Sequence, residues 1–311
     1  MVLITTALID FPSFMRLAQV CKRLAYLVFT EQQIWRHLCL GWEYGFPAMH
    51  YAWTMTVEGD PLPTSIEDEG VSLALISPVP QPLSNDPLPV AIPTPLPPLM
   101  PSYKLSKTYP TYSHMFRHRP RIRFNGIYIS TVNYIRPGQA APSSSTWGAP
   151  VHIVTYYRYL RFFRDGAVLS LLTTDEPSQV VHELRPELLH KKPPANSIVA
   201  LVLRGRWKLG GEPEFSRLPN GNWTDNTTHP SSSEGEAEID ESALTVETEG
   251  CKDTYVYRME FMLKGQERGR PRLVWKDFWN WNREQDEWQE FGLRNDRAFV
   301  FSRVRGYGLG A

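Results

Sequence analysis

Residues 151–173 have the sequence Val-His-Ile-Val-Thr-Tyr-Tyr-Arg-Tyr-Leu-Arg-Phe-Phe-Arg-Asp-Gly-Ala-Val-Leu-Ser-Leu-Leu-Thr. Two runs rich in β-branched and aromatic residues flank the pair Asp165-Gly166. An Asp-Gly pair favours a tight turn between antiparallel strands, because glycine adopts the backbone angles that such a turn requires. The stretch therefore predicts a β-hairpin with strands at 151–163 and 167–173, the strongest hairpin pattern in the chain.

The flanking sequence predicts more strands. Residues 121–130 alternate in polarity around Gly126, which indicates a bulge or a close approach of two backbones. Further strands are predicted at 198–209, 255–263, 272–282, 288–293 and 298–307. About eight antiparallel strands form either a closed barrel or a sandwich. Tyr128 on the first strand, with Arg303 or Arg305 on the last, resembles the closure of lipocalin-like barrels and favours the barrel.

Tryptophans are concentrated in the last third of the chain. With the two-residue period of a strand, Trp275, Trp279 and Trp281 share one face. They either line a ligand cavity or fill the interior of the barrel, and the second interpretation is favoured because small barrels are filled by side chains.

Two segments lack the pattern of regular structure. Residues 57–108 contain a proline-rich run: 12 of the 27 prolines lie between Pro61 and Pro101. This composition predicts a disordered linker. Residues 210–253 are acidic and rich in Ser and Gly, and they predict a disordered insertion within the β domain. The predicted domains are helices at 1–56, the linker at 57–108 and the β domain at 109–311, which makes the fold class α+β.

The N-terminal residues predict two short helices. Apolar residues recur at helical spacing from Phe14 to Val28, over more than one sector of the helix surface. Thr30 and Gln33 have the spacing of a capping box for the next helix, which directs Trp35 inward and ends at Gly41. One supporting neighbour would leave part of this apolar surface in water, so the helices require a partner.

The order Leu17-x-x-Val20-Cys21-Lys22-x-Leu24, followed by Ile34-Trp35-x-x-Leu38, resembles the second and third helices of an F-box. The resemblance implies docking to the Skp adaptor of a cullin-based ubiquitin ligase. The implied adaptor-binding residues are Leu8, Phe14, Leu17, Val20, Cys21, Leu24, Ile34, Trp35 and Leu38. The usual Leu-Pro opening is absent, so either the sequence lacks an upstream part or docking is weak.

Three further stretches resemble the C-terminal domain of the F-box-only-nine family. They are Phe116-Arg-His-Arg-Pro-Arg-Ile-Arg-Phe-Asn-Gly-Ile-Tyr-Ile-Ser, Tyr156-Tyr-Arg-Tyr-Leu-Arg-Phe-Phe-Arg-Asp-Gly, and Phe301-Ser-Arg-Val-Arg-Gly-Tyr. Members of that family are substrate receptors of SCF ligases, which combine a Skp adaptor with cullin and RING subunits. The resemblance implies a receptor without catalytic residues, a fungal-type arrangement of insertions, and a protein substrate whose ubiquitination leads to degradation.

Arginines suggest where a substrate would bind. The candidates are Arg117, Arg119, Arg121, Arg123, Arg158 and Arg161. Guanidinium groups bind phosphate and carboxylate in a bidentate manner, so an acidic or phosphorylated substrate is one interpretation. A solvated face or cross-strand pairing with acidic residues is the other. Nucleic-acid binding is disfavoured, because 33 basic residues balance 33 acidic ones.

No motif for catalysis, a cofactor or a metal stands out. His114 and His118 have metal-ligand spacing, but no third ligand lies near them in sequence. The three cysteines are scattered, which predicts a reducing compartment. The sequence has no long apolar run and no signal-peptide pattern, so we expect no membrane contact and a location in the cytoplasm, with the nucleus as a second compartment. Two other functions stay open: a lipocalin-like carrier of a small apolar ligand, and a hydrolase whose site the sequence does not reveal.

Overall fold

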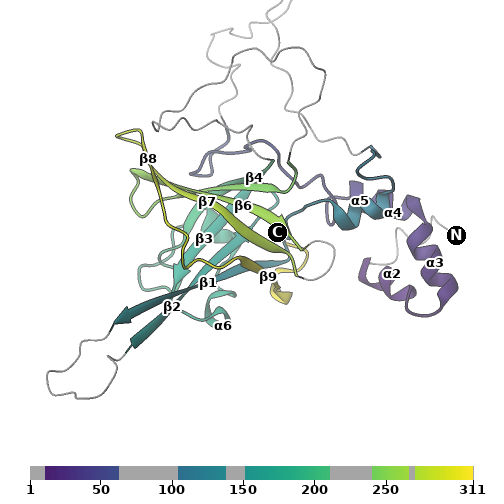
Figure 1. Cartoon of the computed structure of the whole chain (residues 1–311), viewed down its shortest axis with the longest axis horizontal. Helices are drawn as coiled ribbons and strands as arrows, with labels where there is room; N and C mark the ends of the chain where they lie inside the picture. Colours follow the sequence, from purple (N-terminus) through teal and green to yellow (C-terminus); the bar gives the residue numbers. More distant parts are fainter. Residues whose placement is uncertain (1–10, 63–103, 138–150, 211–239, 266–269, 311) are drawn as a thin grey trace, which may run out of the picture.

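The computed structural model describes residues 11–62, 104–137, 151–210, 240–265 and 270–310. N-terminal helices lie at one side of a β-barrel, and a further helix lies between them and the barrel (Figure 1). The predicted fold class, a small helical part followed by an antiparallel β-barrel, is confirmed. Residues 63–103 of the linker expected at 57–108 lie outside the described residues, as do residues 211–239 of the expected insertion.

The helices are short. They are α2 (Phe11–Leu17), α3 (Lys22–Thr30), α4 (Gln32–Leu40), α5 (Tyr112–His118) and α6 (Pro177–Val180), with 3-10 turns η1 (Pro186–Leu189) and η2 (Arg305–Tyr307). Glu31, rather than Thr30, caps α4, because its side chain accepts a hydrogen bond from the backbone N–H of Gln33. The Thr30 hydroxyl instead donates to the carbonyl oxygen of Tyr26. As predicted, α4 ends at Gly41.

The strands form one antiparallel sheet that closes on itself. They are β1 (Gly126–Pro137), β2 (Val151–Phe162), β3 (Ala167–Thr173), β4 (Leu203–Leu209), β5 (Ala243–Glu249), β6 (Tyr255–Lys264), β7 (Arg272–Asn282), β8 (Glu287–Glu290) and β9 (Phe299–Arg303). The order around the sheet is β6-β5-β4-β3-β2-β1-β9-β7, and pairing of β6 with β7 closes the barrel. Strand β8 pairs with the last four residues of β7, Trp279 to Asn282.

The hairpin that the sequence predicts most strongly is present as β2 and β3. Gly166 has a φ of +97° at the turn, a backbone conformation that residues other than glycine rarely adopt. Gly126 allows β1 to approach β9, because a Cβ atom there would overlap the carbonyl oxygen of Ser302. Residues 121–125 precede the strand instead of belonging to it.

Strand β5 contradicts part of the expected insertion. Residues 243–249 lie within the acidic run, yet they pair with β4 on one side and β6 on the other. Two acidic residues of β5 face arginines across the β4–β5 pair: Glu247 contacts Arg206 at 2.7 Å, and Glu249 contacts Arg204 at 2.6 Å. Opposite charges on facing strands stabilise the pairing, so these acids support a strand that their number seemed to exclude.

A β-bulge corrects the expected arrangement of tryptophans. The register of β6 and β7 shifts between Glu260 and Phe261, so the two-residue period breaks after Trp275. Trp275 packs inside against Phe261, with ring centroids 4.6 Å apart. Farther along β7, Trp281 stacks on Trp288 of β8 at 5.7 Å. Trp275 therefore belongs to the core, as favoured, but it does not share a face with Trp281.

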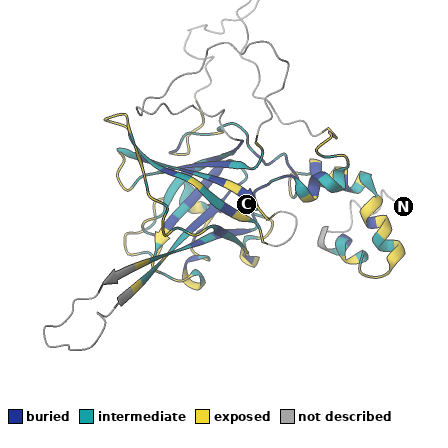
Figure 2. Ribbon diagram, viewed as in Figure 1, coloured by how far each residue is buried: buried dark blue, intermediate teal, exposed yellow. Residues whose placement is uncertain are grey.

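One end of the barrel is filled. The buried aromatic side chains there include Tyr128, Phe162, Trp207 and Phe261. Figure 2 shows buried residues along the strands of the barrel. The segment after α4 covers this end, with Phe46 and Met49 buried in the same cluster. The backbone N–H of Leu209 in β4 donates to the carbonyl oxygen of His50 at 2.7 Å. The N-terminal part and the barrel therefore share one hydrophobic core.

Candidate functional site

The outer side of the helices carries apolar side chains that the described chain leaves exposed. On α3 this side is largely exposed (Figure 2). Val20 is 70% exposed, Tyr26 69% and Leu27 46%. Phe29, Leu40 and Trp42 are exposed as well. Three of the six lie on α3, and the others lie just before it or at the end of α4. Because exposed apolar side chains that gather in one region typically mark an interaction surface, these six residues define the helix surface.

The opposite side of α4 is fixed to α5. Trp35 is 1% exposed, donates through Nε1 to the carbonyl oxygen of Val28 at 2.8 Å, and lies 5.5 Å from the Phe116 ring. Gln32 Oε1 accepts from the backbone N–H of Tyr112 at 3.0 Å. The Cys39 thiol donates to the carbonyl oxygen of Tyr112 at 3.4 Å. These contacts hold the helix surface in a defined position beside the barrel.

The implied adaptor-binding residues separate into three groups. Phe14 and Trp35 are buried, and Val20 and Cys21 are exposed. Leu17, Leu24, Ile34 and Leu38 are half-buried. Leu8 lies outside the described residues. Of the six residues of the helix surface, the resemblance supplied only Val20; it did not supply Tyr26, Leu27, Phe29, Leu40 or Trp42.

Burial distinguishes Cys39 from the other two cysteines and predicts a difference in reactivity. Desolvation raises the pKa of the Cys39 thiol to about 11, whereas Cys21 and Cys251 are exposed. At pH 8 only about a thousandth of Cys39 would be thiolate, the form that reacts. We expect iodoacetamide to modify Cys21 and Cys251 in the folded chain, and Cys39 only after denaturation. Mass spectrometry of the labelled peptides measures this, and rapid labelling of Cys39 in the folded chain would contradict the burial described.

The six candidate arginines do not form one surface. Arg119 is 1% exposed and donates from Nη2 to Glu241 at 2.6 Å. Arg121 is 5% exposed and donates from Nη1 to the carbonyl oxygen of Tyr44 at 2.8 Å. Arg161 is 3% exposed and donates to the carbonyl oxygen of Leu184. These three side chains hold separate segments together in the interior, which corrects the expectation that they would contact a substrate.

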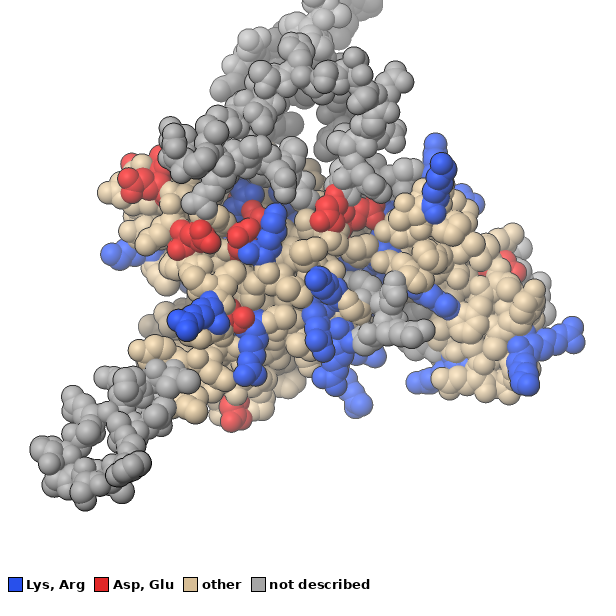
Figure 3. All heavy atoms as spheres, viewed as in Figure 1, with Lys and Arg blue, Asp and Glu red and all other residues tan. Residues whose placement is uncertain are grey.

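The other three candidates lie apart from one another. The Arg117 guanidinium is 4.5 Å from the centre of the Phe29 ring, next to the helix surface. Arg123 is half-buried, and burial lowers its pKa. Arg158 lies inside the barrel with its Nε 3.2 Å from Asp296 Oδ1. On the face that Figure 3 shows, lysines and arginines likewise occupy separate positions over the helices and the barrel.

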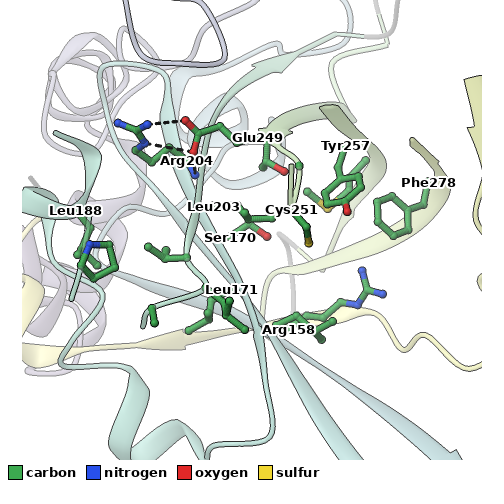
Figure 4. A pocket seen from close by; sticks show the side chains of 18 of the residues that line it. Arg158, Ser170, Leu171, Leu188, Leu203, Arg204, Glu249, Cys251, Tyr257 and Phe278 are labelled. Carbon is green, nitrogen blue, oxygen red and sulfur yellow. Dashed lines mark hydrogen bonds and ion pairs between the residues drawn. The ribbon is translucent and has the colours of Figure 1, made fainter. Parts of the chain in front are cut away.

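The end of the barrel opposite Phe46 contains a cavity of about 740 Å³ (Figure 4). Residues of seven strands line it, together with the loops after η1 and β8. This volume is within the range of sites that bind small molecules.

In the described residues, no three His, Cys, Asp or Glu side chains lie close enough together to hold a metal ion. None of the described helices combines the length and apolar character needed to cross a membrane.

Comparisons with known proteins match both parts of the chain. Residues 1–41 match the family described as F-box-like, and residues 104–229 match the F-box only protein C-terminal region. No solved structure shows significant similarity to the chain.

Two curated fungal proteins are similar to it. F-box protein HRT3 of Saccharomyces cerevisiae is 34% identical over 194 residues, which is 62% of this chain and 45% of that protein. F-box protein pof7 of Schizosaccharomyces pombe is 29% identical over 203 residues, 65% of this chain and 47% of that protein. The chain thus spans about half the length of these relatives. The chain is thus similar to F-box-only proteins in two parts, an F-box-like segment at 1–41 and an F-box-only C-terminal region at 104–229.

Proposed function

We propose that this chain is the substrate receptor of an SCF-type ubiquitin ligase. The helix surface would dock to a Skp adaptor, which links the receptor to cullin and RING subunits, and the barrel would hold the protein substrate. The observation that carries the proposal is the exposed apolar side of α3 and α4, whose other side is fixed to α5 through Trp35 and Phe116. The match of residues 1–41 to the F-box-like family supports it.

In this role the chain itself needs no catalytic residue. A receptor raises the rate of ubiquitin transfer by holding a lysine of the substrate near a conjugating enzyme that is bound elsewhere in the ligase. Ubiquitination would direct the substrate to degradation, in the cytoplasm and the nucleus. Because the helices and the barrel share one core, a docked substrate would keep a fixed orientation relative to the adaptor.

Adaptor binding tests this function. The full chain is expected to co-purify with a fungal Skp adaptor, and replacing Val20 and Leu27 together by Asp should weaken the complex at least about thirtyfold, because two exposed apolar contacts are lost. Ile153→Asp is the matched control, since Ile153 is 65% exposed on the barrel, away from the helices. Failure of the unmodified chain to bind, or equal binding by the double variant, would refute adaptor docking through this surface.

The cavity supports a second candidate function, a lipocalin-like carrier of a small apolar ligand. Its volume suits a fatty-acid-sized molecule. A rise in the melting temperature of the chain with dodecanoate would favour this function. A carrier of this kind would not need to bind the adaptor.

A further inference from the structure

The cavity opens at only one end of the barrel. Ser170 and Leu172 of β3 and Leu203 of β4 line it, whereas Val168 and Trp207, farther along the same two strands, are buried in the filled end. A polypeptide cannot pass through such a cavity. A chain end can therefore fill it by entering once, whereas the middle of a chain would have to enter and leave through the same opening.

Arg158 of β2 supplies the positive charge inside. Its Nε lies 3.2 Å from Asp296 Oδ1, and its guanidinium carbon lies 5.1 Å from the centre of the Phe278 ring and 5.6 Å from that of Trp275. Figure 4 shows the guanidinium on the same side of the cavity as Phe278. Within the described part of the chain, no acceptor is in hydrogen-bond contact with Nη1 or Nη2. Asp296 therefore occupies one edge of the guanidinium and leaves donors for a second carboxylate.

The surroundings of Arg158 would strengthen such a contact. The Arg158 side chain is only 21% exposed, and this burial lowers the pKa of its guanidinium. A charge-assisted hydrogen bond is stronger in these surroundings than in water. Another acid in the wall, Glu249, is already held by Arg204 at 2.6 Å. Lys192 and Asp253 also line the cavity, but both are exposed at its rim.

Thr248 adds a polar group that the protein itself does not use. Its side chain is fully buried and lines the cavity, and its hydroxyl oxygen has no hydrogen-bond partner. Leaving a buried hydroxyl without a partner is unfavourable, so a bound ligand that pairs with it gains free energy. Ser170 places a second hydroxyl-bearing residue in the wall. A peptide has amide groups that can pair with such hydroxyls, whereas an alkyl chain has none.

Apolar side chains make up much of the remaining wall. They are Leu171, Leu188, Leu201, Leu203, Met259, Phe278, Phe291 and Phe299. Figure 4 shows Leu203, Leu171, Tyr257 and Phe278 arranged around the space that Arg158 borders. Apolar side chains of a ligand would lose contact with water there, which favours binding.

We propose that the cavity binds the C-terminus of a protein substrate that ends in apolar residues. The terminal carboxylate would accept hydrogen bonds from the Nη atoms of Arg158, a backbone amide near the end would pair with Thr248, and the last side chains would contact Phe278 and Met259. The N-terminus of a chain does not fit, since its ammonium group would face Arg158. This inference rests on the proposed receptor function and specifies the class of substrate.

Peptides with two kinds of C-terminus test the inference on the full chain. The probes are fluorescent decapeptides whose last three positions are mixtures of Leu, Ile, Val, Phe and Met, made with either a free carboxylate or an amide at the end. Fluorescence polarisation should show binding of the free acids that is at least about tenfold tighter than that of the amides. Dodecanoate is tested separately as a small apolar acid.

Three variants locate the binding. Arg158→Met combined with Asp296→Asn removes the ion pair without leaving a buried charge, and it should abolish the preference for the free acid. Thr248→Val removes the unpaired hydroxyl, so it should weaken peptide binding without lowering the melting temperature. Arg303→Met is the control, because Arg303 is exposed at the opposite end of the barrel and should leave peptide binding unchanged.

Equal binding of acids and amides, binding of dodecanoate without peptides, or no binding at all would overturn the inference. Co-purification with the Skp adaptor is measured on the same variants. Because Arg158 and Thr248 are in the barrel, adaptor binding should be unchanged. If the unmodified chain binds the adaptor but no peptide, only the C-terminus inference is refuted, whereas failure of the unmodified chain to bind the adaptor would refute the receptor function.

Discussion

Replacing Arg121 by glutamate is expected to unfold the chain. The Arg121 guanidinium lies 3.8 Å from the centre of the Phe116 ring and donates to the carbonyl oxygen of Tyr44. A glutamate there would bring a negative charge beside a carbonyl oxygen and an aromatic ring, in a site that is 5% exposed. Burying an unpaired charge costs several kcal/mol, and we expect a loss of at least about 4 kcal/mol in the free energy of unfolding.

Urea denaturation followed by circular dichroism measures this loss. Arg117→Glu is the control, because Arg117 is exposed and its replacement should change the free energy of unfolding by no more than about 1 kcal/mol. If Arg121→Glu unfolds at the same urea concentration as the unmodified chain, the buried position of Arg121 is wrong. The result also decides how substrate assays on Arg121 are interpreted, since loss of capture would then follow from unfolding.

Replacing Trp35 by alanine is expected to release the helices while the barrel stays folded. Trp35 joins α4 to α5 through the Phe116 ring and closes the α3–α4 turn through its hydrogen bond to Val28. Truncation of a buried tryptophan typically costs about 3–5 kcal/mol, and helices of seven to nine residues have little stability of their own.

Hydrogen exchange resolved by segment would show the release. Amides of α3 and α4 in Trp35→Ala should exchange much faster than in the unmodified chain, whereas those of β2, β3 and β7 should keep most of their protection. Trp42→Ala is the control, because Trp42 is 53% exposed and its loss should leave the protection of the helices nearly unchanged. Unchanged protection of α3 and α4 in Trp35→Ala would contradict the role given to Trp35.

The fold could be predicted where the determining pattern is local. Strand β3 has the bounds that were predicted from the Asp165-Gly166 turn, and β7 has the bounds predicted from its alternating residues. The prediction that Trp35 faces inward is likewise borne out by its burial. In each case the residues that decide the structure are neighbours in sequence.

Features that depend on distant partners were missed. The acids of β5 indicated disorder until their arginines on β4 were known, and these lie about forty residues away in the chain. Arg119 looked like a surface residue because its partner, Glu241, is 122 positions away. The bulge in β7 left no local pattern, so a strict two-residue period assigned Trp281 to the same face as Trp275.

The candidate sites likewise divide into one that depends on residues close in sequence and one that depends on residues far apart. The helix surface was partly predicted, because its spacing is local and resembles a known module. The cavity could not be located from sequence, since Arg158, Thr248, Asp296 and Phe278 come from four separate segments. The unpaired hydroxyl of Thr248 has no counterpart in any sequence pattern, because it is defined by the absence of a neighbour in the fold.

The contacts of Gln32 and Cys39 with Tyr112 join two parts of the chain whose peptide connection runs through residues 63–103. A proteolytic nick within those residues is therefore expected to leave two fragments that remain associated, through these hydrogen bonds and the core shared by Phe46, Met49 and Trp207.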